Sequence, residues 1–316
     1  MQNAKVSKQD LLDCHSRIKP YIHRTPVLSS TAINTIAGAE IYFKCENFQR
    51  MGAFKMRGAT NAILQLSESQ RANGVVTHSS GNMAQAVSLG AKSVGIPAYI
   101  VMPENAPQVK KNAVKGYGGQ VTETVSTIEA RQAAADKLIA RHTASFIHPS
   151  NDLDVILGQG TAAMELLEEQ PELDVIAVPV GGGGLLAGTA LAAHYFGQNC
   201  KTVAGEPLEA DDAYKSLKAG KILKNDSANT IADGLRTHLG DINFPIIQEY
   251  VDEIIRVEEQ EIIAAMRLVW ERMKIIIEAS CAVPLAAILA EKEKFQNQKI
   301  GIVITGGNVD LGKLPF

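Results

Sequence analysis

Residues 175–196 read VIAVPVGGGGLLAGTALAAHYF, and this stretch decides the fold. A short β-branched run ends in glycines and is followed by an Ala/Leu-rich run, which is the pattern of a buried strand, a tight turn and a helix. Runs of the same kind alternate along the rest of the chain. They predict the α/β fold class, in which helices flank mostly parallel sheets.

The alternation also places the other elements. We expect strands at residues 40–44, 74–77, 98–102, 121–124, 175–179, 202–206, 253–257 and 301–305, and helices at 83–94, 128–140, 185–196 and 259–273. In open α/β sheets, ligands bind beyond the carboxyl ends of strands, where the N–H groups of helix N-termini gather. Three polar or Gly-rich turns fall at such ends, at residues 79–82, 181–184 and 305–308.

Composition limits the class of protein. With 316 residues, 46% hydrophobic and 21% charged, the chain is expected to be soluble and to form about two domains. The 31 Lys+Arg and 34 Asp+Glu form no basic cluster, so no nucleic-acid partner is expected. No run approaches the ~18 apolar residues of a membrane span, and the N-terminal residues 1–8 lack an apolar signal core. Four scattered cysteines without a CxxC pair favour a reducing, cytoplasmic location.

Lys55 is the candidate nucleophile. It lies in GAFKMRG, residues 52–58, where Ala53 and Phe54 could desolvate its amine and lower its pKa. A solvated surface lysine is an equally good interpretation of the local sequence. An amine that faces a Gly-rich phosphate cradle, however, indicates an aldehyde cofactor that carries a phosphate, and that cofactor is pyridoxal phosphate.

The glycine run at 181–184 fits such a cradle, because backbone amides can converge on a phosphate where no Cβ intervenes. It lacks a Walker lysine and the GxGxxG spacing, so an ATPase loop or a dinucleotide site fits poorly. A tight turn without a ligand is the alternative for the run by itself. The SSGN turn at 79–82 similarly fits a helix start, and helix N-termini also hold carboxylates.

An acidic loop follows the strand predicted at 202–206. It contains Glu206, Asp211 and Asp212. Clustered carboxylates can bind a hard cation, but acidic loops are more often only solvated. From the residues alone, the solvated loop is the simpler interpretation.

Taken together, the motifs resemble those of the fold type II (tryptophan synthase β-like) pyridoxal-phosphate enzymes, and among them the serine racemase and serine/threonine dehydratase group. The resemblance runs nearly end to end and rests on KCEN (44–47), GAFKMRG (52–58), SSGN (79–82), GQGT (158–161), GGGG (181–184), TIADG (230–234) and GGN (306–308). It implies two domains, each an open, mostly parallel twisted sheet flanked by helices. The large cofactor-binding domain would comprise residues 1–73 and 152–316, and a small mobile domain residues 74–151.

The resemblance also implies roles for single residues. Lys55 would hold pyridoxal phosphate as a Schiff base, with other cofactor contacts from Phe54, Asn82, Gly181, Gly182, Gly183, Gly184 and Thr305. Lys55 and Ser80 would be the catalytic pair, one on each face of the substrate Cα. Many plain threonine dehydratases have alanine in place of Ser80, so this serine favours racemisation. Substrate contacts would come from Ser79, Ser80, Gly81, Asn82, Met83, Arg131 and Asp233.

The same resemblance favours a metal site in the acidic loop, because residues 205–214 are similar to the divalent-cation loop of that group. Glu206 and Asp212 would provide side-chain ligands and Ala210 a backbone carbonyl, for Mg²⁺ or alternatively Ca²⁺ or Mn²⁺. A homodimer is implied. Nucleotide activation occurs in some relatives and is left open.

Two departures from the family pattern bear on substrate preference. Met83 stands where the family usually has histidine, and Glu278-Ala279-Ser280-Cys281-Ala282 replaces the more usual Glu-Pro-Ser/Thr-Gly-Ala. Our leading hypothesis is a serine racemase with serine/threonine dehydratase (ammonia-lyase) activity on small hydroxyamino acids. The alternatives are a dehydratase for threonine or 3-hydroxyaspartate that does not racemise, and a non-catalytic homologue that binds the cofactor or an amino acid.

Overall fold

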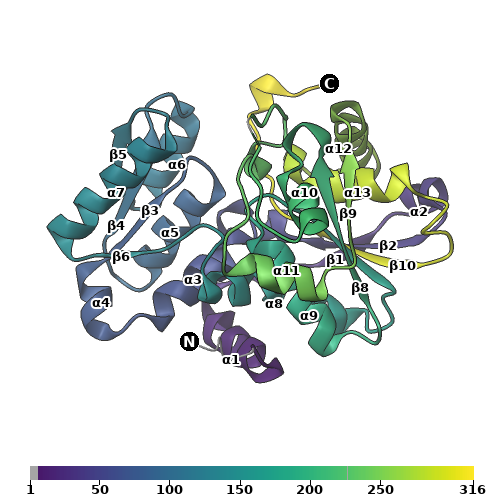
Figure 1. Cartoon of the computed structure of the whole chain (residues 1–316), viewed down its shortest axis with the longest axis horizontal. Coiled ribbons are helices and arrows are strands. Elements are labelled where there is room, and N and C mark those ends of the chain that lie inside the picture. Colours follow the sequence, from purple (N-terminus) through teal and green to yellow (C-terminus); the bar gives the residue numbers. More distant parts are fainter. Residues whose placement is uncertain (1–5, 226) are drawn as a thin grey trace.

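The computed structural model describes residues 6–225 and 227–316 (Figure 1). Six strands form the larger sheet, in the order β1-β2-β10-β7-β8-β9. Strand β1 runs antiparallel to β2, and the remaining neighbours are parallel. The strands are β1 (Val27–Ser29), β2 (Glu40–Cys45), β7 (Val175–Pro179), β8 (Lys201–Pro207), β9 (Glu253–Val257) and β10 (Lys299–Ile304).

Four strands form the second sheet, in the order β5-β4-β3-β6, and all neighbours are parallel. Figure 1 shows this sheet, in blue and teal, beside the larger one. Its strands are β3 (Val75–His78), β4 (Ala98–Pro103), β5 (Gln120–Thr124) and β6 (Ser145–Phe146).

Helices surround both sheets. They are α1 (Lys8–Ile18), α2 (Thr31–Ala37), α3 (Lys55–Gln65), α4 (Glu68–Asn73), α5 (Asn82–Ser93), α6 (Gln108–Gly116), α7 (Ile128–His142), α8 (Leu153–Glu169), α9 (Gly184–Phe196), α10 (Asp212–Ala219), α11 (Asn243–Tyr250), α12 (Glu259–Met273) and α13 (Ala279–Ala290). Two of the short 3₁₀ turns matter below, η4 (Leu208–Ala210) and η5 (Asp233–Leu235).

The α/β class predicted from the alternating pattern is confirmed, with two mostly parallel sheets between helices. Each predicted strand and helix is present, and its ends lie within two residues of the predicted ones. Strands β1 and β6 were not predicted, because runs of three and two residues carry too little periodicity to recognise. The second sheet lies within the predicted small domain, whose bounds and mobility stay predictions.

Apolar side chains cover both faces of the larger sheet. Along β10, Ile302 and Val303 point to opposite faces and belong to separate apolar clusters, as alternation along a strand requires. One cluster joins the sheet to α2, α12 and α13, and the other joins it to α1, α8, α9 and α11. Both faces are thus buried, which is typical of a parallel sheet.

Helix α3 lies between the two sheets and packs closely on α8. A Cβ on Gly58 would come within 2.4 Å of Gln159 Nε2, and one on Gly158 within 2.5 Å of the Gly58 Cα. Two of the quoted motifs, GAFKMRG and GQGT, therefore meet where the backbones of two helices cross. The opposite side of α3 shares an apolar cluster with α5, in which Met56 and Met83 take part.

A buried group of charges connects α3 to the larger sheet. Arg57 of α3 donates to Glu46, after β2, at 2.8 Å from both Nε and Nη2, and to Glu165 of α8 at 2.9 and 2.8 Å. Lys44 Nζ lies 2.8 Å from Glu165, and the four side chains are at most 1% exposed. Two cations and two anions balance, so the charged forms are tolerated inside the protein. We call Lys44, Glu46, Arg57 and Glu165 the buried ion network.

We predict that Glu165→Gln lowers the free energy of unfolding by about 3–5 kcal/mol, because it leaves an uncompensated positive charge in the core. Urea denaturation monitored by circular dichroism would measure the change. Glu168→Gln is the matched control on the same helix, since the Arg24–Glu168 pair is 49% and 42% exposed and such pairs contribute about 0–1 kcal/mol. Equal effects of the two variants would contradict the stabilising role of the network.

Candidate active site

Lys55 is the first residue of α3, and its surroundings lower its basicity. The preceding residue, Phe54, donates its backbone N–H to Thr305 O at 2.9 Å, which anchors the start of the helix to the end of β10. Lys55 Nζ donates to Pro149 O at 2.7 Å and lies 5.0 Å from the centroid of the Phe54 ring. Burial without a carboxylate partner lowers the pKa of Lys55 to about 8. Part of the amine is therefore neutral, and nucleophilic, near pH 7.

The segment before Lys55 pairs with the segment after β10. Ala53 forms an antiparallel bridge with Gly306, and Gly307 N donates to Gly52 O at 2.9 Å. Two motifs that are separated by 250 residues in the sequence thus form one wall. The wall stands at the carboxyl end of β10, where α/β sheets hold ligands.

The glycine run lies between β7 and α9, and protein atoms approach it so closely that side chains are excluded. A Cβ on Gly182 would come within 2.4 Å of Ser150 Oγ, and Gly183 has a φ of +81°. Buried Asn243 fixes the loop, since it donates to Gly182 O at 2.9 Å and accepts from Gly240 N at 3.1 Å. The first N–H groups of α9 have no partner within the helix. A narrow loop at a helix N-terminus fits a phosphate, so the chain can hold the phosphate of pyridoxal phosphate here.

Asn82 joins the second sheet to the larger one. It begins α5, donates to Glu278 Oε1 at 2.8 Å and accepts from Asn308 Nδ2 at 2.8 Å. Burial raises the pKa of Glu278 to about 8, so this carboxyl is mostly protonated at neutral pH. No role was predicted for Glu278 and Asn308, because their contacts with Asn82 are not local in sequence.

Thr305, the expected partner of the pyridine nitrogen, is 2% exposed. Its Oγ1 lies 3.1 Å from the Cys281 Sγ, and the same sulfur contacts Gly306 N at 2.9 Å. Burial raises the pKa of the Cys281 thiol, so this neighbour stays uncharged. Sequence reasoning noticed Cys281 as a departure from the family but did not place it beside Thr305.

The expected substrate contacts lie in different surroundings. Ser79, Ser80 and Gly81 are half-buried, and Ser79 Oγ accepts from Gly81 N at 3.2 Å. Met83 is 2% exposed and packs within the apolar cluster of the second sheet. Half-buried Arg131 lies on α7, where its Nε donates to Thr127 O at 3.3 Å. The structure does not test the substrate roles, which stay predictions.

The expected metal ligands lie near the end of β8, in η4 and at the start of α10, and they are Glu206, Ala210 and Asp212. Glu206 accepts from Ala213 N at 2.9 Å and from Tyr214 N at 2.8 Å. Asp212 Oδ1 accepts from Asn225, whereas its buried Oδ2 makes no hydrogen bond and lies 3.6 Å from His238 Nδ1. Burial raises the pKa of Asp212 to about 7 and that of Glu206 well above its usual range. Two buried acids, one of them with an oxygen that makes no hydrogen bond, fit a cation in place of the protons.

No group of three or more His, Cys, Asp or Glu side chains in the described part of the chain has the geometry of a metal site. A cation at Glu206 and Asp212 would therefore need oxygen from the buried Ala210 carbonyl and from water. Asp211 is engaged elsewhere, because it pairs with Lys215 at 2.5 Å and with Arg256 at 3.1 Å.

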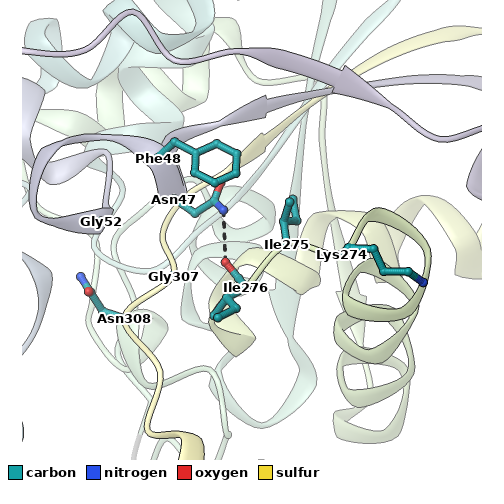
Figure 2. Close-up of a pocket in the computed structure, with 8 residues that line it drawn as sticks. All are labelled: Asn47, Phe48, Gly52, Lys274, Ile275, Ile276, Gly307 and Asn308. Atoms are coloured by element: carbon teal, nitrogen blue, oxygen red, sulfur yellow. Dashed lines mark hydrogen bonds between the residues drawn. The ribbon is translucent and has the colours of Figure 1, made fainter.

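A cavity of about 360 Å³ lies behind the wall described above (Figure 2). Figure 2 shows Asn47 Nδ2 bonded to Ile276 O, at 3.1 Å, across one side of this cavity. Asn308 lines it and also binds Asn82, so the cavity borders the candidate site without containing Lys55. The lining residues are Asn47, Phe48, Gly52, Lys274, Ile275, Ile276, Gly307 and Asn308.

Comparisons with known proteins agree with this geometry. The family model described as "Pyridoxal-phosphate dependent enzyme" matches residues 18–306. A serine racemase of Dictyostelium discoideum is 53% identical over 98% of this chain and 97% of its own length, and a β-hydroxyaspartate dehydratase of Paracoccus denitrificans is 47% identical over 98% of both. The crystal structure of the Dictyostelium enzyme superposes with a TM-score of 0.93, over 98% of this chain and 100% of that one.

We predict that the stability of the cofactor-free protein depends on pH through Lys55. The folded-state pKa of about 8 lies below the ordinary 10.5, so between these pH values the unfolded chain binds more protons and stability rises with pH. Lys55→Met should therefore be more stable than the wild type below pH 8, and the difference should disappear towards pH 10.5. Urea denaturation of both proteins across this range tests it, and a difference independent of pH would contradict the lowered pKa.

Proposed function

The chain belongs to the pyridoxal-phosphate dependent enzyme family, and within this family we propose that it is a serine racemase with serine/threonine dehydratase activity. The observation that carries the proposal is the Lys55 amine, whose pKa is lowered to about 8 at the strand ends that also hold the SSGN and GGGG turns. Full-length similarity to a serine racemase supports the substrate.

Pyridoxal phosphate would be held by residues from several elements. Gly181, Gly182, Gly183 and Gly184 would bind the phosphate, and Phe54, Asn82 and Thr305 would contact the ring. When bound, the cofactor supplies an aldehyde that combines with amines and a conjugated ring that withdraws electrons from Cα. Thr305 offers a neutral hydroxyl to the ring nitrogen, which holds a proton there less firmly than a carboxylate would. Acids and bases of the protein near Cα then decide the product.

Lys55 and Ser80 would be these acid–base groups, one on each face of Cα. An amine with a pKa of about 8 both accepts and returns a proton near neutral pH. Return of the proton from the opposite face inverts the amino acid, whereas loss of the β-hydroxyl leads from serine to pyruvate and ammonia. Ser79, Gly81, Asn82 and Met83, at the N-terminus of α5, would bind the substrate carboxylate.

A dehydratase for threonine or 3-hydroxyaspartate without racemisation is the second candidate. The 47% identity to a β-hydroxyaspartate dehydratase favours it, and Arg131 and Asp233 would then bind the β-substituent. A non-catalytic homologue is the third candidate. Full turnover by Lys55→Ala, or no turnover of any hydroxyamino acid by the wild type, would reject the enzymatic role of Lys55.

We also propose that a cation, Mg²⁺ or else Ca²⁺ or Mn²⁺, binds Glu206, Asp212 and the Ala210 carbonyl. The Asp212 Oδ2 atom, which makes no hydrogen bond, supports it. The ion would stabilise the connection between β8 and α10, since Glu206 lies in β8 and Asp212 begins α10.

The assembly and location are further parts of the proposal: a homodimer in the cytoplasm, with a nucleotide as activator. Phe48 and Ile276, each 47% exposed at the cavity of Figure 2, are large apolar groups of the kind found at subunit contacts. Lys274 also lines that cavity, but its Nζ donates to Glu271 O and its side chain points away from the other lining residues in Figure 2. Within the described residues, none of the helices has the length and apolar character needed to cross a membrane.

We predict that Ser80→Ala abolishes racemisation of L-serine and retains dehydration, because only racemisation needs a proton from the second face. A time course that quantifies D-serine and pyruvate in the same samples would test this. We expect a loss of D-serine formation of about 10²-fold or more, the usual contribution of a general acid. Ser93→Ala, at the opposite end of α5, is the control, with both products retained; parallel loss of both activities in Ser80→Ala would reject the two-base mechanism.

We predict that divalent cations raise the melting temperature of the wild type and that Asp212→Asn removes this response. At a free cation concentration of 100 times the dissociation constant, binding raises the free energy of unfolding by about 2.7 kcal/mol. Thermal denaturation with MgCl₂, CaCl₂, MnCl₂ or EDTA measures it. Asp211→Asn is the control and should keep the response, because Asp211 is already paired with Lys215 and Arg256. A wild type indifferent to all three cations would reject the site.

A further inference from the structure

An ion pair connects the two sheets at the edge of the candidate site. Lys110, on α6 of the second sheet, places its Nζ 2.6 Å from Asp233 Oδ2 on η5. Asp233 was predicted to contact the substrate, and no local pattern in the sequence singles out Lys110. This inference rests on the proposed function and concerns the substrate of the same site.

The surroundings of the pair locate it between the two ligand-binding turns. On one side, η5 packs on the glycine run, since a Cβ on Gly181 would lie 2.7 Å from the Leu235 Cα. On the other side, the Glu278 carboxyl is influenced by the charges of both Lys110 and Asp233 and is bonded to Asn82 at 2.8 Å. The pair therefore lies close to the groups that would hold the phosphate and the substrate.

Lys110 can exchange its partner at little energetic cost. The side chains of Lys110 and Asp233 are 24% and 51% exposed, and ion pairs at such exposure contribute little to stability. An ammonium has three donors, of which the bond to Asp233 uses one. A substrate carboxylate can thus take the place of Asp233 and offer Lys110 the same kind of bond.

Without Lys110, a second substrate carboxylate would meet the Asp233 carboxylate with like charge. Neighbouring Glu278 adds little to this repulsion at neutral pH, because burial keeps it mostly protonated. Arg131, the other cation expected to face the site, directs its Nε to Thr127 O of its own helix. Lys110 is consequently the cation that compensates Asp233.

We propose that Lys110 is the specificity residue for substrates with a second carboxylate, such as 3-hydroxyaspartate. The lysine releases Asp233 and binds the β-carboxylate of these substrates. With serine or threonine it stays on Asp233, whose carboxylate then accepts a hydrogen bond from the β-hydroxyl. One site accordingly serves both neutral and acidic β-substituents.

The test compares Lys110→Met with Lys115→Met, a control that removes the same charge from an exposed position of the same helix. The dehydration of L-serine and of L-threo-3-hydroxyaspartate is measured with each holoenzyme. For Lys110→Met, kcat/KM for hydroxyaspartate should fall by roughly ten- to hundredfold, the contribution of a charged hydrogen bond, chiefly through KM. The value for serine should change by less than about threefold, as for a weak exposed ion pair. Lys115→Met should leave the ratio of the two kcat/KM values unchanged.

Two further results would support the proposal or overturn it. Asp233→Asn should raise the ratio of kcat/KM for hydroxyaspartate to kcat/KM for serine, because it frees Lys110. An equal loss for both substrates in Lys110→Met would overturn the proposal, since the pair would then only hold the sheets together. A wild type that dehydrates serine but not hydroxyaspartate would also overturn it, while the proposed function would stand.

A binding measurement keeps the proposal testable if the proposed activity is absent. Succinate has two carboxylates on a four-carbon chain, and butyrate has one. The dissociation constants are measured by calorimetry with the holoenzyme. Lys110→Met should weaken the binding of succinate about tenfold or more, as expected for one charge-assisted bond, and leave the binding of butyrate unchanged. Equal affinities of wild type and variant for succinate would overturn the role of Lys110.

Discussion

The buried ion network is the constraint on which the site depends. Arg57 lies two residues after Lys55 in the first turn of α3, and its guanidinium bonds to carboxylates of two different elements. A guanidinium fork binds a carboxylate at fixed angles, so it orients as well as attracts. Since desolvated charges are costly when their geometry is poor, the helix can start in few other positions. The place of the Lys55 amine is thus fixed from the interior of the protein.

The contrast between Arg57 and Lys55 shows how burial gives opposite results for two residues in the same turn of α3. Burial lowers the pKa of both groups, but two carboxylates more than compensate at Arg57 and keep it charged. Lys55 has a carbonyl, Pro149 O, as its partner, so its pKa falls to about 8. Desolvation thus acts on both groups, and their partners make the difference. Arg57 bonds to carboxylates and stays a structural cation, whereas Lys55 bonds to a carbonyl and becomes a reactive amine.

Local patterns in the sequence predicted the elements and the turns at strand ends, because hydrophobic periodicity and glycine geometry are local properties. They did not predict which side chains meet across the site. Glu278, Cys281 and Lys110 contact Asn82, Thr305 and Asp233, which are 196, 24 and 123 residues away in the sequence. Such pairs depend on how elements far apart in the sequence pack together, and a single sequence carries no periodic signal for that packing. Met83 is a different case, since its substrate contact stays a prediction, while nothing in the sequence indicated that its side chain packs in the apolar cluster between α3 and α5.

The contacts between the two sheets differ from one edge of α3 to the other. Where α3 meets α5, the contact is apolar and well packed, with Met56 and Met83 in one cluster. Around the ligand-binding turns, the contacts are hydrogen bonds and one ion pair, from Asn82 to Glu278 and from Lys110 to Asp233. Apolar packing resists separation, whereas an ion pair as exposed as Lys110–Asp233 exchanges readily with ligands or water. The polar contacts around the ligand-binding turns are therefore the ones that a bound substrate can replace, while the apolar contact of α3 with α5 stays in place.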